Sequence, residues 1–319
     1  MENVDVYAYG VIASSTLHLL SQPFPQSDGY AEIDRTYAMT GGEALNSSIV
    51  LSRLGLQVLL DGNWIGDTAK GKSLLETIQS YKIDTRRLRV KQGYSGVREI
   101  VFSDGQSRTI FGNYIDLLST QRKWNTPRKV DLARAKIACV DPPFRDESLM
   151  VGRYAIELEI PFVTIDCPYD HELSIGAATV IVSGEFRNRE YPQAKLVDLF
   201  SEYQQRAGGL VVFTAGSEDI MYGRKGEPIK RFKPYSVKVK DSTGAGDSFR
   251  AGVIYGILNK WSDAAIVQYA SAVAGMVCAS FPGVLHSPTC ATVTRFIRAQ
   301  NKAKRKKEED PHSIIPYNT

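Results

Sequence analysis

Short apolar runs alternate along the chain with longer stretches in which apolar residues recur at helical spacing. Two strand-like runs, 4–12 and 58–60, stand near the N-terminus, and helical spacing follows Gly42 up to Gly55 and again over 72–81. Further runs rich in β-branched residues occur at 137–140, 162–165, 180–182 and 210–213. Such alternation predicts βαβ units, and therefore a three-layer α/β/α fold with a doubly wound, mostly parallel sheet.

The pattern changes between Ser95 and Tyr114. Apolar and polar residues alternate on both sides of Asp104-Gly105, which is typical of a hairpin with a tight turn. Because no continuous buried run occurs here, the segment is predicted to be a small β appendage on a larger core. In such folds, ligands bind beyond the carboxyl ends of the parallel strands.

Residues 241–247, with the sequence DSTGAGD, are the strongest candidate for chemistry. The turn leads into Phe249, Val253 and Ile257 at helical spacing, so it lies at a helix N-terminus, where free backbone N–H groups favour an anion such as phosphate. A carboxylate beside a phosphate site is repulsive unless Asp247 takes a proton from a hydroxyl while the amides of 244–246 stabilise a phosphoryl group in transfer. The alternative is an ordinary helix cap.

Composition indicates an ordinary globular protein. The 319 residues are 43% hydrophobic and 23% charged, with a formal charge of +4. Part of this charge lies in a basic run that begins at Lys302, which we interpret as a frayed, solvated tail. No basic-aromatic pattern elsewhere indicates a nucleic-acid surface, so no nucleic-acid partner is expected.

The four cysteines, Cys139, Cys167, Cys278 and Cys290, are scattered and lack the spacing of a metal site. The N-terminus does not resemble a signal peptide, and no apolar stretch has the length of a membrane span. We therefore expect a cytoplasmic protein with free thiols and no membrane partner.

Three segments occur in the order of the ribokinase-like carbohydrate kinases, the phosphofructokinase-B family. They are GGEALN at 41–46, followed by LSRLG at 51–55; Gly66-Asp67 with Gly71; and the 241–247 turn. The first and last of these segments match the family's two signature regions. Either signature alone is unspecific, but both in this order make the resemblance strong over residues 4–297. The resemblance implies one ribokinase-like kinase domain over 1–300, with a β lid from about 95–114 plus part of 13–40, and a charged tail at 301–319.

Carried over by position, the resemblance implies an ATP-dependent kinase that phosphorylates a hydroxyl of a sugar or sugar acid. Asp247 is the implied base, and Gly244, Ala245 and Gly246 form the anion hole. The implied substrate contacts are Gly41, Gly42, Asn46, Ser15, Arg98 and Arg108. The implied nucleotide contacts are Thr214, Gly216, Ser217, Thr243 and Ser183.

The resemblance also implies Mg²⁺, ordered through water by Glu185, and a monovalent cation such as K⁺ near Asp241 and Ser287. The lid over 95–114 implies closure over the substrate and a homodimer interface. For Arg98 and Arg108 the alternative is two solvated side chains on an exposed hairpin.

Several elements depart from the family pattern, among them Asp166-Cys167-Pro168-Tyr169 and Asp219 in the nucleotide loop. Ser15 stands at or near the position where sugar-binding relatives carry an aspartate, which favours relatives that bind sugar acids through basic residues. The family's Asn-x-x-Glu element reads Ser183-Gly184-Glu185-Phe186 here. Two alternatives to a sugar kinase stay open: a nucleoside kinase of the same fold, and a ligand-binding or regulatory protein that has lost the activity.

Overall fold

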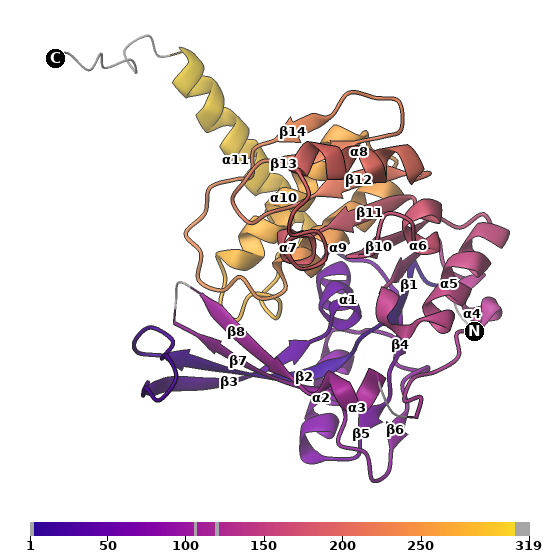
Figure 1. Cartoon of the computed structure of the whole chain (residues 1–319), viewed down its shortest axis with the longest axis vertical. Helices are drawn as coiled ribbons and strands as arrows, with labels where there is room; N and C mark the ends of the chain where they lie inside the picture. Colours follow the sequence, from indigo (N-terminus) through magenta and orange to yellow (C-terminus); the bar gives the residue numbers. More distant parts are fainter. Residues whose placement is uncertain (1–2, 105–106, 119–120, 310–319) are drawn as a thin grey trace.

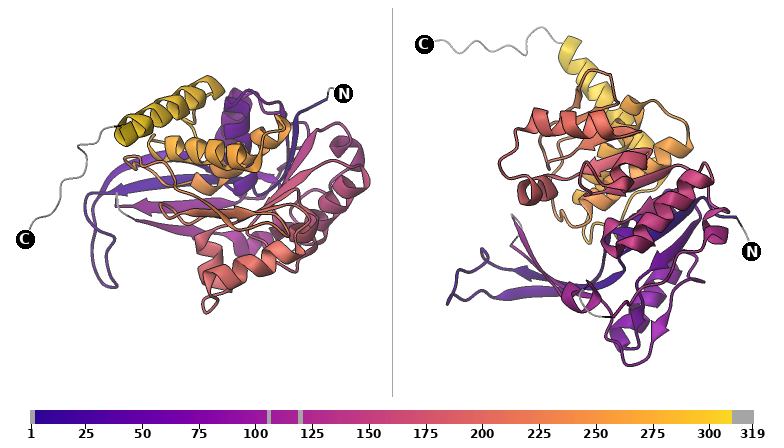
Figure 2. Two further views of the ribbon diagram at one scale, coloured as in Figure 1. Left: turned by 90° about the horizontal axis from the view of Figure 1, so that it is seen from above. Right: turned by 45° about the vertical axis from the view of Figure 1, so that its right-hand side comes forward.

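The computed structural model describes residues 3–104, 107–118 and 121–309, with the backbone alone over 304–309. A large sheet covered by helices forms the main body, and a smaller sheet extends from one side of it (Figure 1). The right-hand view of Figure 2 separates these parts: the smaller sheet projects away from the helices that cover the large one.

The large sheet has the strand order β14-β13-β12-β11-β10-β9-β1-β4 in the described chain. The six strands from β12 to β4 run parallel, and each of their residues is buried. Burial on both faces explains their short, nearly continuous apolar runs. These six strands are β1 (Val6–Gly10), β4 (Val58–Gly62), β9 (Ile137–Val140), β10 (Phe162–Ile165), β11 (Thr179–Val182) and β12 (Leu210–Phe213).

Helices cover both faces of this sheet, because successive strand residues point to opposite sides. Val6 and Ala8 of β1 belong to an apolar cluster formed with α1 (Glu43–Arg53), α2 (Ala69–Ser80), α9 (Ala245–Leu258), α10 (Asp263–Cys278) and α11 (Cys290–Glu309). Tyr7 and Tyr9 face the other layer, where two clusters are formed with α4 (Lys129–Leu132), η1 (Pro142–Phe144), α5 (Asp146–Glu157), α6 (Glu172–Gly176), α7 (Gly184–Glu190) and α8 (Leu196–Arg206). The three-layer α/β/α prediction is therefore confirmed.

The smaller sheet has the order β3-β2-β7-β8. β2 pairs antiparallel with β3 and parallel with β7, and β7 pairs antiparallel with β8. Its strands are β2 (Ala13–Leu20), β3 (Ile33–Gly41), β7 (Arg98–Ser103) and β8 (Arg108–Gly112). Leu17, Met39 and Val101 form a small apolar cluster on one face, where Phe281 and Leu285 from the main body contact them.

Several elements were not anticipated from the sequence. β13 (Ile220–Gly223) and β14 (Lys230–Phe232) add an antiparallel edge to the large sheet, and β5 (Ile65–Gly66) pairs with β6 (Val90–Lys91). A short helix, α3 (Tyr114–Leu118), follows β8. Helix α11 continues through residues 301–309, which we expected to be a frayed tail. Residues 310–319 and Gly105 of the expected hairpin turn lie outside the described residues.

All four cysteines are unpaired thiols. None of the helices in the described ranges combines the length and the apolar character that crossing a membrane requires.

Candidate active site

Gly244 shapes the turn that begins α9. It is the N-cap residue, with φ of 73°, which is a left-handed conformation that favours glycine. A Cβ at this position would lie 2.3 Å from Cγ2 of Val284, so the space also requires glycine. The first turn of a helix has no intrahelical acceptors for its N–H groups. Ala245 donates to the carbonyl of Ser242 at 3.3 Å, whereas Gly246 is solvent-exposed at the positive end of the helix dipole.

Asp247 lies in the first turn of α9 and is only 8% exposed. The Asn46 amide nitrogen donates to its Oδ2 at 2.9 Å, and Thr40 in turn donates to Asn46 Oδ1 at 3.1 Å. Burial raises the pKa of Asp247 to about 6; Asp141 adds to this effect, while Arg250, Asn46 and Arg108 oppose it. The carboxylate is thus held in one orientation, and its pKa is suited to accepting a proton near neutral pH.

The two distant signature segments meet at this carboxylate. Gly42 caps α1 with φ of 86°, and a Cβ there would lie 2.4 Å from the carbonyl oxygen of Val11. This close approach of backbones brings α1 against β1 and directs Asn46 toward α9. Ser47, one residue further, donates to the backbone oxygen of Asp247 at 3.1 Å. Both polar ends of Asn46 therefore have protein partners, so its direct contact in this structure is with Asp247.

A buried ion pair beneath Asp247 was missed by the sequence analysis. Arg250, fully buried in α9, pairs with Asp141, which follows β9. Asp141 also accepts from the backbone N–H of Val11 at 2.8 Å, and Arg250 donates to Ser47 at 3.0 Å. The pair joins the carboxyl ends of β1 and β9 to α1 and α9. Its signal in the sequence was an arginine inside the apolar stripe of 249–257.

Ser15 and Glu99 face each other across the parallel β2–β7 pair. Ser15 is 4% exposed, and its Oγ has no hydrogen-bond partner among the described residues. Tyr114 donates to the Glu99 carboxylate, and a Cβ on Gly41 would lie 2.0 Å from Glu99 Oε2. Burial raises the pKa of Glu99, an effect that Tyr114 opposes. Glu99 was not among the predicted residues, because only cross-strand register places it beside Ser15 and Gly41.

Arg108 connects the smaller sheet to the turn before α9. Its Nη1 donates to the carbonyl of Ser242 at 2.6 Å, and its Nη2 lies 3.1 Å from Oε1 of Glu185, whose side chain is 80% exposed. Arg98, at the start of β7, is exposed, and its backbone N–H donates to Asn113 at 2.6 Å. Of the two predicted arginines, the structure therefore brings Arg108 to the candidate anion site.

The predicted nucleotide segment follows β12. Thr214 donates its backbone N–H to Val182 at 3.0 Å, and Gly216 has φ of 54°. Gly216 and Ser217 are exposed, so the loop is accessible beside the neighbouring strand end.

Ser183 occupies the end of that neighbouring strand, β11. Its hydroxyl accepts from the N–H of Phe186 at 3.0 Å and donates to Asp166 at 2.9 Å, so it caps α7 and has two protein partners. Asp166 itself follows β10 and has φ of 51°.

Asp241 is a buried carboxylate that accepts from two backbone N–H groups, at 2.9 Å from Thr243 and 3.3 Å from Gly283. The Oγ of Ser287 is fully buried and has no hydrogen-bond partner among the described residues. The same described ranges contain no cluster of three or more His, Cys, Asp or Glu side chains of the kind that holds a metal ion.

Comparison with known proteins gives consistent results. The model of the pfkB family carbohydrate kinases matches residues 31–290. The chain is 24% identical to a 5-dehydro-2-deoxygluconokinase of Clostridium botulinum over 82% of its own length and 85% of the relative's. It is 26% identical to a nucleoside kinase of Methanothermobacter thermautotrophicus over 86% of its own length and 90% of the relative's. The fold is shared with a ribokinase of Arabidopsis thaliana solved with ribose and ATP. The two structures have a TM-score of 0.76 at 15% sequence identity, over 93% of this chain and 99% of the ribokinase.

Proposed function

Because the chain belongs to the pfkB family of carbohydrate kinases, which are ATP-dependent phosphotransferases, we propose that it transfers the γ-phosphoryl group of ATP to a hydroxyl of an uncharged, sugar-type acceptor. Asp247 is the base that removes the hydroxyl proton. The backbone amides of Gly244, Ala245 and Gly246 stabilise the charge on the transferring group.

The observation that carries this proposal is the position of Asp247. Its carboxylate, oriented by Asn46, lies in the same helical turn as the exposed backbone of Gly246 at the start of α9. A proton acceptor and an anion site are thus fixed beside one another, and phosphoryl transfer requires mainly such positioning and charge stabilisation.

We place the nucleotide along the loop that holds Thr214, Gly216 and Ser217, with Ser183 and Thr243 on its phosphate side. The exposed loop supports the placement. The Ser183 hydroxyl already has two protein partners, so its contribution is to hold the start of α7 rather than to donate freely.

Mg²⁺ fits Glu185 by chemistry, since an exposed carboxylate can order water around a hard cation. When bound there, the ion supplies positive charge to the nucleotide phosphates. Glu185 pairs with Arg108 in this structure, so the arginine side chain would move aside or share the carboxylate.

A monovalent cation fits near Asp241 and Ser287. The buried Ser287 Oγ lacks a partner, and the Asp241 carboxylate is fixed by backbone N–H groups of Thr243 and Gly283. A bound cation would satisfy the hydroxyl and anchor the segment that leads into the anion turn.

The proposed acceptor site lies between the two sheets, at Ser15, Glu99, Gly41 and Gly42. Serine offers a weak hydroxyl contact, but the Glu99 carboxylate beside it is a strong acceptor for sugar hydroxyls. A carboxylate at this position would repel the acid group of a sugar acid. Because Arg108 is directed to Ser242 and Glu185, we favour a neutral acceptor over a sugar acid.

We also propose that the smaller sheet is a lid that forms a homodimer interface. Ile100 and Phe111 form a cross-strand pair on one face of the β7–β8 edge of this sheet, with 43% and 52% of their surface accessible. Such a patch on paired strands is suited to a second copy of the same sheet.

The test is a panel of neutral sugars, sugar acids and nucleosides, assayed for ADP release with ATP and Mg²⁺. We expect turnover with a neutral sugar-type compound and a loss of roughly 10²–10⁴-fold in kcat for Asp247→Asn, with ATP binding retained. Turnover confined to sugar acids or to nucleosides would overturn the proposed acceptor class. Near-normal turnover by the Asp247→Asn variant would overturn the role of the base.

A further inference from the structure

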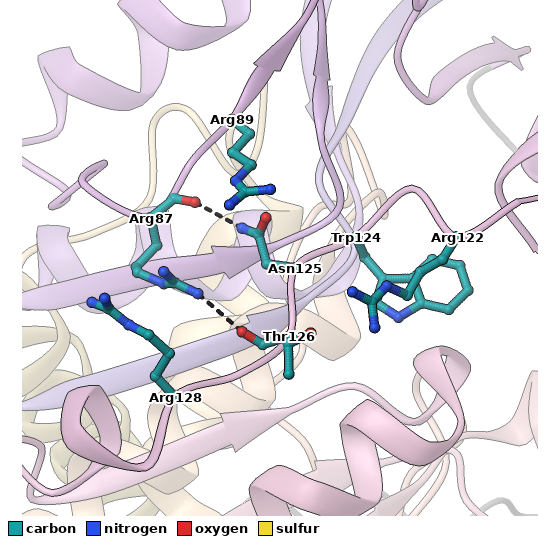
Figure 3. A pocket seen from close by; sticks show the side chains of 7 residues that line it. All are labelled: Arg87, Arg89, Arg122, Trp124, Asn125, Thr126 and Arg128. Atoms are coloured by element: carbon teal, nitrogen blue, oxygen red, sulfur yellow. Dashed lines mark hydrogen bonds between the residues drawn. The ribbon is translucent and has the colours of Figure 1, made fainter.

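A pocket of about 330 Å³ lies outside the candidate active site, and four of its seven lining residues are arginines. Figure 3 shows these side chains around the segment 124–126. The lining residues are Arg87, Arg89, Arg122, Trp124, Asn125, Thr126 and Arg128.

Three of the arginines are held in place by carboxylates. Arg87 lies 3.0 Å from Asp61 and 3.4 Å from Asp131, and it donates to the carbonyl of Thr126 at 3.0 Å. Arg128 forms a two-pronged contact with Asp131, at 2.7 and 3.0 Å. These contacts fix the direction of each guanidinium group, so little conformational entropy remains to be lost when a ligand binds.

Arg122 is fixed in the same way at the other side of the pocket. Its Nη1 lies 2.6 Å from Glu147, a carboxylate that also accepts from the indole N–H of Trp124 at 3.0 Å.

The carboxylates lie behind the pocket wall rather than in it. The side chains of Asp61 and Asp131 are fully buried, that of Glu147 is 14% exposed, and none of the three lines the pocket. A ligand therefore meets N–H donors, with no acidic group at the wall to repel an anion. Four arginines against three carboxylates also leave one positive charge in excess.

Arg89 is the arginine that carries the excess positive charge. Within the described ranges, no carboxylate lies within ion-pair distance of it, and its exposed side chain borders the same pocket as the three fixed arginines. An anion in the pocket would supply the missing partner.

We propose that this arginine pocket binds a small phosphorylated compound. The N–H donors of a guanidinium group match the spacing of phosphate oxygens, so one group can form two parallel hydrogen bonds with a phosphate. The volume is at the low end for ligand sites, which suits a sugar phosphate or a smaller anion rather than a nucleoside triphosphate. This site is independent of the kinase site and of the identity of the phosphoryl acceptor.

The experiment is isothermal titration calorimetry of the full chain with inorganic phosphate, pyrophosphate and glucose 6-phosphate. A saturating non-hydrolysable ATP analogue is present throughout, so that the nucleotide site is occupied. The test variant combines Arg89→Gln with Arg122→Gln. Both side chains are exposed, and the contacts between Arg87, Arg128 and the buried aspartates remain intact.

The matched control combines Arg153→Gln with Arg206→Gln. These arginines are also exposed; unlike Arg89, both form ion pairs, with Glu172 and Glu202, and they lie on α5 and α8 and do not line the pocket. The control removes the same charge from the protein.

We expect wild-type protein to bind at least one probe, the test variant to bind it at least tenfold more weakly, and the control to change the affinity by less than twofold. If glucose 6-phosphate binds more tightly than the inorganic probes, the pocket also recognises the sugar. If all probes bind equally, the pocket recognises the phosphate group alone. Three results overturn the proposal. They are no binding of any probe at a concentration of roughly 10 mM, unchanged affinity of the test variant, and an equal loss of affinity in the test and control variants.

Discussion

The environment of Asp247 sets the pKa on which its proposed role as a base depends. A carboxylate in water has a pKa of about 4 and is a weak proton acceptor at neutral pH. Burial in the first turn of α9 raises the pKa of Asp247 to about 6, although Arg250, Asn46 and Arg108 all favour the charged form. Desolvation, to which the charge of Asp141 adds, therefore outweighs one hydrogen bond and two nearby positive charges. The result is a stronger base that is still ionised at pH 7.

This balance predicts the pH dependence of the reaction. Asp247 accepts a proton only when ionised, so kcat/KM should fall tenfold per pH unit below about pH 6 and stay level above it. The measurement is kcat/KM for the acceptor between pH 5 and 9 at saturating ATP. A level profile down to pH 5 would contradict the raised pKa.

Asn46→Ala provides the control for this assignment. The Asn46 hydrogen bond stabilises the charged form of Asp247, so its loss should raise the pKa of Asp247. The fall in kcat/KM on the acidic side of the profile (the acid limb) should then begin at a higher pH. A merely structural role for Asn46 would lower the rate at every pH and leave the limb in place.

At the scale of elements, α1 and α9 are joined through charge buried between them. Arg250 of α9 is fully buried, pairs with Asp141 after β9 and donates to Ser47 of α1. Removing one member of a buried pair leaves the other charged and without a partner, which is costly in a medium that solvates charge poorly.

Arg250→Met should therefore lower the free energy of unfolding by about 3–5 kcal/mol. The measurement is urea denaturation followed by circular dichroism. In the double variant Arg250→Met with Asp141→Asn, the residue at 141 is neutral and retains an oxygen for the N–H of Val11, so part of the loss should be recovered. A loss below about 1 kcal/mol for the single variant would show that the pair is not important for stability.

The sequence predicted elements better than their contacts. Buried parallel strands such as 137–140 and 210–213 form apolar runs that are read directly, and they occur as expected in β9 and β12. The edge strand β14 was missed because 230–232 is mostly exposed and contains two basic residues. Glu99 was missed for another reason: its place beside Ser15 depends on the register of β2 and β7, which are far apart in the sequence and carry no local signal of their pairing.

At the scale of the whole molecule, the two sheets contribute residues to the candidate site from different parts of the fold. The large sheet brings the ends of its parallel strands and the start of α9, while the smaller sheet brings Ser15, Glu99 and Arg108 (Figures 1 and 2). Arg108 on β8 reaches across to Ser242 and Glu185 of the main body. Its partners are a carbonyl in the anion turn and an exposed glutamate, so the contact can open and close without exposing a buried charge.

Arg108→Ala should loosen the smaller sheet while leaving global stability within about 0.5 kcal/mol of wild type, because partly exposed ion pairs contribute little to folding. We expect the backbone amides of β8 to exchange with deuterium several-fold faster, since β8 is an edge strand that loses its contact with the main body. Hydrogen–deuterium exchange with mass spectrometry measures this without knowledge of the acceptor. Arg98→Ala removes the same charge from the same sheet at an exposed position, and it should leave exchange in β8 unchanged. Equal exchange in all three proteins would mean that Arg108 does not hold the sheet to the main body, whereas faster exchange in the Arg98→Ala variant as well would assign the effect to the charge of the sheet rather than to the contact.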